Sequence, residues 1–339
     1  MKIHIIFNFR DGAFGGGNQF LKALRGFFES SAAYETNIAQ ADVIIFNSYQ
    51  QINKLIKAKL EFPEKVFIHR VDGPIRLYCR GNDRRDYVVA ALNELISDGT
   101  VFQSNWSREK NYIMSFPKKN THTIIMNAPD PEIFNREDKT AYSKKQKTRL
   151  IASSWSNNLN KGFEVYRWLD KNLDFNKIDM VFVGRTPIKF HKIKHIYPLD
   201  SKRLALELKK SDIFIIASQK DPCSNALIEA MHCGLPAIAL RNGGHAEIIG
   251  SAGELFENSE EIPALIEKIK SNYSFYQANI KLPGIKDIGT QYYRFCQDIF
   301  GQRKKAAFNI KKLSLMGRFK ILKEVCLWKA SERFICKPA

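Results

Sequence analysis

Residues 211–240 constrain the fold more than any other part of the sequence, because they encode a strand, an acidic loop, a helix and a second strand in succession. An apolar run stands at each end of the segment, as is typical of buried parallel strands. Between the runs, Ser224 or Asn225 can cap a helix whose apolar residues recur at helical spacing, and Gly234 ends it. This succession of elements predicts an α/β domain with a parallel sheet.

Two carboxylates frame this helix. Asp221 precedes it and Glu229 lies on its second turn, so a hydroxyl-rich ligand at the positive helix end could be held by both acids. The pair resembles the E-x7-E motif of family 4 retaining glycosyltransferases of the GT-B fold, with Asp in place of the first Glu. The alternative is that Asp221 only caps the helix and Glu229 forms a solvated ion pair, but the flanking strands favour the motif.

The resemblance implies an α/β, GT-B fold: two Rossmann-like doubly wound domains facing across a cleft. Two series of strand-like runs, separated by a charged segment, agree with this organisation. The expected parts are an N-terminal acceptor-side domain over 1–134, a linker over 135–148, a C-terminal nucleotide-sugar donor-binding domain over 149–286, a helix crossing back to the N-terminal domain over 287–300, and a basic amphipathic tail over 301–339.

A second motif follows the first strand of the C-terminal half. Lys161 and Gly162 resemble the end of the family's Arg-x5-Lys-Gly donor-phosphate motif, while Trp155 or a neighbouring serine such as Ser154 occupies the arginine's region. Lys161 would neutralise the leaving diphosphate as a point charge, and Arg185 is a candidate for a second positive charge. The alternative for Lys161 is a solvated lysine at a helix start.

A glycine loop follows the first strand of the chain. Gly15, Gly16 and Gly17 precede a helical pattern, and residues without Cβ atoms permit close approach of a phosphate or sugar to the backbone. A flexible turn is the alternative, and Phe20 stands where a dinucleotide fingerprint needs a third glycine. The resemblance completes the expected donor-binding set with the base-reading region and the start of the acidic helix: Leu199, Ser224, Asn225 and Ala226.

The acceptor side is assigned to the end of the strand-like run 66–71. Asp72 stands there before a glycine, where the family often has a histidine, and open α/β sheets place chemistry at such strand ends. We therefore predict that Asp72 acts with Asp221, Glu229 and Lys161 as the catalytic set. His69, Arg70 and Arg84 are further acceptor-side candidates; the alternative is a solvated basic face for the two arginines and a side chain that points elsewhere for His69.

The net charge of +18 calls for an anionic partner or surface, and eleven basic but only two acidic residues lie after residue 302. Interleaved apolar residues make this stretch a candidate for docking on an anionic membrane through 303–337. The equally weighted alternative is a helix packed on the folded body. Nucleic acid is not expected as a partner, since no recognition motif accompanies the charge.

Metals and cofactors are not expected. The six cysteines form no C-x-x-C pair and the histidines do not cluster with them, so free thiols are predicted. No Asp-x-Asp motif is present, which favours metal-independent chemistry. The first residues lack a signal-peptide core and no apolar run is long enough to cross a bilayer, so the expected location is cytoplasmic, with peripheral association to the inner face of the membrane.

The resemblance implies a hexosyltransferase-type enzyme that moves a sugar from a nucleotide diphosphate sugar to a hydroxyl acceptor with retention of configuration. The expected acceptor is a lipid-linked or surface polysaccharide or glycan intermediate. Two alternatives stay open: a nucleotide-sugar epimerase of the same fold, and a non-catalytic nucleotide-sugar-binding protein. A dehydrogenase ranks behind both.

Overall fold

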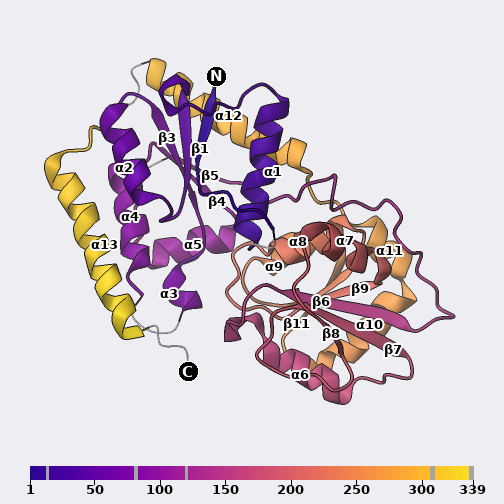
Figure 1. The fold of residues 1–339 in the computed structure, drawn as a ribbon. Coiled ribbons are helices and arrows are strands. Elements are labelled where there is room, and N and C mark those ends of the chain that lie inside the picture. The colour runs from indigo at the N-terminus through magenta and orange to yellow at the C-terminus, as the bar shows by residue number, and fades with distance from the viewer. Residues whose placement is uncertain (13–14, 80–82, 119–120, 306–309, 336–339) are drawn as a thin grey trace. The chain divides into compact units, whose positions relative to one another are not determined.

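The computed structural model describes residues 1–12, 15–79, 83–118, 121–305 and 310–335, and Figure 1 shows the path of the chain. The chain divides into two compact units. The first contains Met1–Phe9, Leu24–Met126 and Lys286–Ala339, and the second contains Arg10–Ala23 and Asn127–Ile285. Each unit is built around its own parallel sheet.

The first unit has a five-stranded parallel sheet. Its strands are β1 (Ile3–Ile6), β2 (Val43–Asn47), β3 (Val66–Val71), β4 (Gly99–Phe102) and β5 (Thr121–Ile124). The accompanying helices are α1 (Gly16–Ser30), α2 (Ile52–Glu61), α3 (Ile75–Tyr78), α4 (Arg85–Leu95) and α5 (Asn105–Ile113). Strands β1 to β4 are buried at every residue, which is why they read as apolar runs. The described strands follow one another in chain order, so this sheet contains no reversal of strand order.

The second unit has a six-stranded parallel sheet in the order β11-β10-β9-β6-β7-β8. Its strands are β6 (Thr148–Ser154), β7 (Ile178–Gly184), β8 (Lys194–Ile196), β9 (Ile213–Ile216), β10 (Ala237–Leu240) and β11 (Gly253–Phe256). The helices are α6 (Phe163–Asn172), α7 (Ser201–Lys210), α8 (Asn225–His232), α9 (His245–Ile249), α10 (Ile262–Ser271) and α11 (Tyr273–Ala278). The strand order reverses between β6 and β9, and ligands of open α/β sheets bind beside such a switch point.

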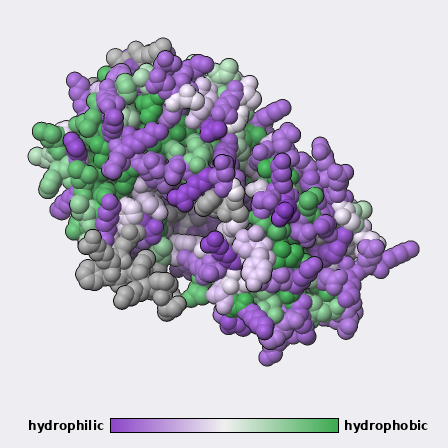
Figure 2. Space-filling model, viewed as in Figure 1, coloured by the Kyte–Doolittle hydropathy of each residue, from purple (hydrophilic) through white to green (hydrophobic). Residues whose placement is uncertain are grey.

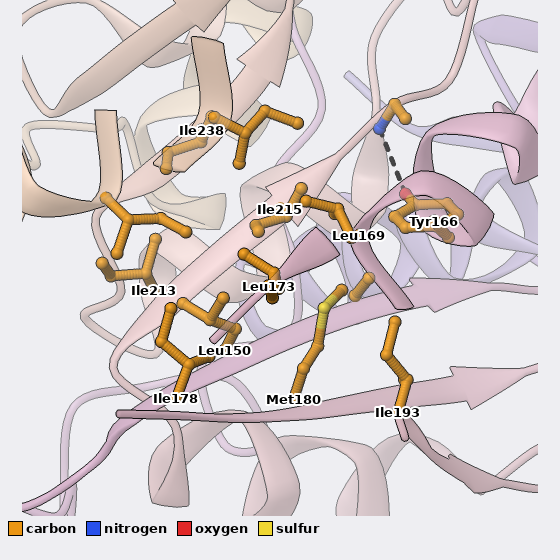
Figure 3. Packing of buried hydrophobic residues seen from close by; sticks show 14 of the residues in the cluster. Leu150, Tyr166, Leu169, Leu173, Ile178, Met180, Ile193, Ile213, Ile215 and Ile238 are labelled. Atoms are coloured by element: carbon orange, nitrogen blue, oxygen red, sulfur yellow. Dashed lines mark hydrogen bonds between the residues drawn. The ribbon is translucent and has the colours of Figure 1, made fainter. Parts of the chain in front are cut away.

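The core of the second unit fixes the two strands at the switch point to α6. Figure 3 shows apolar side chains of β6, β7 and β9 packed against this helix. The amide of Ala217, just after β9, donates a hydrogen bond of 3.1 Å to Tyr166 Oη on α6. Burial raises the pKa of Tyr166 to about 12, so its hydroxyl stays neutral. The end of β9 is thereby held against the helix that begins at residue 163.

The acidic helix forms where the sequence predicts it. Helix α8 begins at Asn225, and Ser224 is its N-cap, with Oγ accepting a hydrogen bond of 3.4 Å from the Leu227 amide. Gly234 adopts the left-handed conformation after the helix, with φ of +83°. The prediction of two parallel α/β domains is confirmed.

The C-terminal segment returns to the first unit. In α12 (Ile285–Lys304), Gly289 approaches Phe27 of α1 so closely that a Cβ atom there would lie 2.2 Å from the ring. Near the end of α12, Arg303 forms an ion pair of 2.5 Å with buried Asp98, which lies beside β4. The helix is therefore anchored at both ends.

The tail forms a helix, α13 (Leu315–Ile335), that packs along α4 and α2 (Figure 1). Ile321 and Leu313 enter the core cluster of the first unit, and Glu324 forms an ion pair of 2.8 Å with Arg84. Of the two alternatives for the tail, packing on the folded body is thus what the structure shows. Residues 306–309 and 336–339 of the tail lie outside the described residues. None of the described helices is both long and apolar enough to span a bilayer.

Replacing Ile321 by alanine is expected to lower the free energy of unfolding by about 2–4 kcal/mol, because the side chain is fully buried under α13. The control is Phe319→Ala on the same helix, which changes a side chain that is 69% exposed and should stay within about 0.5 kcal/mol. Denaturant unfolding measures both. Equal effects would show that α13 does not pack through its Ile321 face.

Candidate functional site

Two charged residues meet beside the switch point. Lys161 follows β6 and Asp221 follows β9, the two strands between which the strand order reverses. Lys161 Nζ lies 3.2 Å from Asp221 Oδ2, and both side chains are largely buried. The geometry brings together the lysine and the first acid, which the sequence separates by 60 residues.

Two glycines allow this meeting. Gly162 has φ of +76°, and a Cβ atom there would lie 2.2 Å from the carbonyl oxygen of Ala217. Gly243 has φ of +64°, and its Cβ would lie 2.2 Å from the carbonyl oxygen of Asp221. The Gly244 amide donates a hydrogen bond of 2.9 Å to the same Asp221 oxygen. Side chains at either position would displace the loops that carry the charged pair.

Asp221 is held in its charged form. Burial works to raise its pKa, but the charge of Lys161 and hydrogen bonds to the carboxylate outweigh burial and lower the pKa below the ordinary value. The carboxylate therefore stays ionised at neutral pH. It can accept hydrogen bonds from ligand hydroxyls on the lone pairs that Lys161 leaves open.

His245 supports Asp221 from the protein interior. It is fully buried, with Nδ1 2.9 Å from the Leu240 carbonyl oxygen and Nε2 3.2 Å from Ser218 Oγ. Ser218 Oγ in turn lies 3.5 Å from Asp221 Oδ2. Burial lowers the pKa of His245, which keeps the ring neutral. Sequence reasoning did not assign His245 to the site; its place directly after the Gly243–Gly244 turn is the signal that could have found it.

The carboxyl group of Glu229 is largely buried and has no hydrogen bond or ion pair among the described residues to offset its loss of solvent. The residue is 8% exposed, and burial is the one cause of its pKa shift. Burial alone raises its pKa to about 8. An ionisable group left in this state costs stability, and such groups are typical of ligand-binding sites.

The glycine loop reaches the start of the acidic helix. A Cβ atom on Gly16, the first residue of α1, would lie 2.3 Å from Asn225 Nδ2, and both residues belong to the second unit. Gly15 and Gly17 have open space instead. Asn18 fixes the loop by exchanging hydrogen bonds of 3.0 Å and 2.9 Å with the backbone of residue 10. The N-termini of α1 and α8 therefore lie together, and the first amides of a helix can bind an anion.

The remaining donor-side candidates occupy the strand ends of the same unit. Ser154 is buried at the end of β6, where its Oγ donates a hydrogen bond of 3.0 Å to the Ser156 carbonyl oxygen. The Arg185 amide donates 2.8 Å to the Ser154 carbonyl oxygen, and the Arg185 side chain is exposed. Leu199 and Ala226 are both half-buried. The structure thus brings Ser154 and Arg185 together through the backbone.

Asp72 is the centre of a polar network in the first unit. Its Oδ2 accepts hydrogen bonds of 2.9 Å from Ser48 Oγ and 3.2 Å from Asn47 Nδ2, and its Oδ1 accepts one of 3.0 Å from Arg70. Gln103 also donates to Oδ1. These groups stand at the ends of β2, β3 and β4, and the carboxyl group of Asp72 stays partly exposed beside its fully buried arginine partner.

The other three acceptor-side candidates need correction. His69 is fully buried and stacked on Phe46 at 4.2 Å between ring centroids, and burial lowers its pKa to about 3. Arg70 is fully buried as well, and its guanidinium holds Asp72. Arg84 is engaged with Glu324 of the tail. His69 and Arg70 are therefore buried residues that an acceptor does not reach, and Arg84 anchors α13.

The prediction of thiols outside disulfides is confirmed for the described chain, where no disulfide includes Cys79, Cys223, Cys233, Cys296 or Cys326. Cys336 lies outside the described residues. No three His, Cys, Asp or Glu residues in the described ranges are grouped as metal ligands.

Known proteins resemble both the sequence and the fold. Residues 165–274 match the family described as Glycosyl transferases group 1. A probable sucrose-phosphate synthase of Thermosipho melanesiensis is 32% identical over 136 residues, which are 38% of this chain and 32% of that protein. The chain therefore spans about a third of the curated relative that it matches.

Solved structures agree over more of the chain. Anabaena HepE (Alr3699) in complex with UDP has a TM-score of 0.60 at 13% identity, covering 91% of this chain and 99% of the other. The catalytic domain of starch synthase IV from Arabidopsis thaliana, bound to ADP and acarbose, has a TM-score of 0.60 at 12% identity, covering 85% and 79%. These similarities show that the fold is GT-B.

Proposed function

We propose that the protein is a glycosyltransferase that moves a sugar from a nucleotide diphosphate sugar to a hydroxyl acceptor, with retained configuration and without a metal ion. The observation that carries the proposal is the site beside the switch point: a charged Lys161–Asp221 pair close to the start of a helix that also bears the uncompensated acid Glu229. Lys161 is a cation, Asp221 is held ionised and Glu229 has a raised pKa, so each is available for a different part of the donor.

Glu229 is assigned to the hydroxyls of the donor ribose. A diol donates two hydrogen bonds, which would replace the water that the buried carboxylate has lost. Asp221, held ionised by Lys161, is assigned to hydroxyls of the transferred sugar. The amides at the starts of α1 and α8 are assigned to the diphosphate, because free helix amides bind phosphate groups.

Lys161 is assigned to the leaving group. Negative charge builds on the diphosphate as the glycosidic bond breaks, so a fixed ammonium group stabilises the transition state more than the ground state. Lys161 can take this role while it remains paired with Asp221. The cation supports a metal-independent reaction, since it neutralises the same charge that a bound metal ion would.

Asp72 is assigned to the acceptor. Its carboxylate is partly exposed and is oriented by groups from three strand ends. The proposed acceptor is a hydroxyl of a lipid-linked or surface glycan intermediate, and the proposed working place is the inner face of the membrane. Matches to the group 1 family over residues 165–274, which include Asp221 and Glu229, support the transferase assignment.

A panel of nucleotide diphosphate sugars tests the donor site. We expect a member of the panel to raise the melting temperature by mass action and to bind about tenfold more weakly to the Gly16→Ala variant, because a Cβ at Gly16 would collide with Asn225. Gly17→Ala is the matched control, since a Cβ at Gly17 meets open space. If Gly16→Ala and Gly17→Ala bound the donor with equal affinity, the assignment of the glycine loop to the donor site would be wrong.

Product analysis separates the alternatives. Incubation of the donor with glycan acceptors should give transfer with retained configuration and unchanged rates after addition of a chelator. Isomerisation of the donor without an acceptor would instead establish an epimerase. Tight donor binding with neither transfer nor hydrolysis across the acceptor panel would point to a non-catalytic binding protein.

A further inference from the structure

The outer face of α13 is apolar although it faces solvent. Leu315 is 84% exposed and Phe319 is 69% exposed, and Met316 and Leu322 on the same helix are exposed as well. At helical spacing Leu315, Met316 and Phe319 lie across the helix from Ile321, the buried contact to the first unit, and Leu322 lies between the two faces. Figure 2 shows hydrophobic side chains gathered over this helix. Exposed apolar clusters of this kind mark interaction surfaces.

Cations surround this apolar face. Lys312, Arg318, Lys323 and Lys329 are all exposed. Among the described side chains of α13, the single acid is Glu324, and Arg84 neutralises it at 2.8 Å. The described part of this face is therefore positive as well as apolar.

A groove runs between α13 and α2. It consists of two hollows of about 350 Å³ each. The first is lined by Ile56 and Leu60 of α2 and Leu322 of α13, and the second by Tyr49, Val325 and Trp328. The charged side chains that line the two hollows are basic except for one: they are Lys57, Arg318, Lys54 and Lys329, and Glu61, which forms an ion pair of 3.7 Å with Lys57.

We propose that this face, defined by Leu315, Met316, Phe319 and Leu322 and by the groove beside them, docks on an anionic lipid bilayer. The helix lies flat in the interface, its apolar side chains enter the acyl boundary, and the surrounding lysines and arginine contact lipid phosphates. The hollows accommodate acyl chains. Charge complementarity selects the bilayer over a second copy of the chain, because two such faces would repel each other.

The docking face also bears on the acceptor of the proposed reaction. This last step, and no earlier one, rests on the proposed function. Tyr49 in the second hollow follows Ser48, whose hydroxyl holds Asp72 at 2.9 Å. The second hollow therefore reaches the residue next to Ser48, which holds the carboxylate assigned to the acceptor. A docked protein would receive a lipid-linked hydroxyl at this edge of the first unit.

Flotation of the full chain with vesicles tests the docking. The protein should bind vesicles containing about 30% phosphatidylglycerol, bind pure phosphatidylcholine weakly, and lose binding as salt rises to about 0.5 M. The double variant Leu315→Asp with Phe319→Asp should bind at least about tenfold more weakly, since two exposed apolar side chains no longer enter the lipid. Lys323→Glu with Lys329→Glu should weaken binding to anionic vesicles only.

The control variants carry the same kinds of substitution at exposed positions on helices other than α13. Ile113→Asp with Leu206→Asp alters side chains that are 74% and 56% exposed, and Lys171→Glu with Lys202→Glu alters exposed lysines. Both control pairs should bind vesicles like the parent chain. Nucleotide-sugar thermal shifts should be unchanged in every α13 variant, so loss of docking and failure of the donor assignment give separate readouts.

Three outcomes would overturn the docking proposal. The first is an absence of vesicle binding, and the second is vesicle binding that is equal in the Leu315→Asp, Phe319→Asp variant and its control. The third is a concentration-dependent dimer, seen by analytical ultracentrifugation, that this variant abolishes while vesicles remain unbound, which would assign the face to a second copy of the chain.

Discussion

Glu229→Gln is expected to stabilise the ligand-free protein and to weaken donor binding. The carboxyl group is buried without a described partner, and burial alone raises its pKa to about 8. Glutamine has nearly the same shape but no charge to desolvate, so the free energy of unfolding at pH 8 should rise by about 1–3 kcal/mol. Loss of charge-assisted hydrogen bonds to the ribose should weaken donor binding about 100-fold.

The raised pKa of Glu229 fixes how the stability gain of Glu229→Gln changes with pH. The folded-state pKa of Glu229 lies above the ordinary value of 4.5, so the folded protein holds a proton that the unfolded chain releases between pH 4.5 and about 8. This contribution to stability is fully present below pH 4.5 and is lost as pH rises to about 8. The gain from Glu229→Gln should therefore be small at low pH and largest near pH 8 and above.

Urea unfolding of the parent chain and the variant at several pH values measures the first effect, and titration with the best donor of the nucleotide-sugar panel measures the second. Glu247→Gln, which changes an exposed acid on α9, is the control and should alter neither quantity. A variant that is destabilised at pH 8, or that binds the donor normally, would show that Glu229 is a structural residue rather than a ligand contact.

Local signals in the sequence were sufficient for helix α8 of the second unit. Helix α8 begins and ends where Ser224 and Gly234 place it, because capping and left-handed backbone depend on neighbouring residues alone. The meeting of Lys161 and Asp221 depends on strand order, which no local pattern records. It could be predicted because the family motif carries that long-range information, and the pairing of β6 with β9 then places both loops at one edge.

The first unit shows where sequence reasoning reaches its limit. His69, Arg70 and Asp72 lie within four positions of one another, and their polarity alone suggests a common exposed site. Only packing distinguishes them: His69 and Arg70 are sealed in the core, whereas Asp72 follows the end of β3 and stays partly exposed. The burial of a polar residue depends on neighbours that are distant in the sequence, here Phe46 on β2 and Ser48 just after it, and pattern reasoning does not place them.

Lys161→Met is expected to reduce the rate of transfer about 1000-fold while weakening donor binding much less. The ammonium group lies 3.2 Å from Asp221 in a largely buried site, where a fixed positive charge acts strongly on charge that develops in the reaction. Because the diphosphate gains negative charge only as the bond breaks, the loss should fall mainly on kcat. Lys161→Arg should restore part of the rate, since it returns the charge with a different shape.

The Lys161→Met substitution should also change the pKa of Asp221. Lys161 is the leading attraction that lowers the pKa of Asp221 against the effect of burial, so its removal should raise that pKa. In the parent chain, Asp221 stabilises the folded state above its unfolded pKa, and this stabilisation is lost as pH falls through the lowered folded pKa. In Lys161→Met the folded pKa is no longer lowered, so this loss of stability at acid pH should disappear.

Single-turnover rates, donor titrations and unfolding at acid pH measure the effects on kcat, on donor binding and on stability. Lys171→Met on the exposed face of α6 is the control. A variant with near-normal kcat would mean that the departing diphosphate is stabilised by other groups, and the role assigned to Lys161 would have to be abandoned.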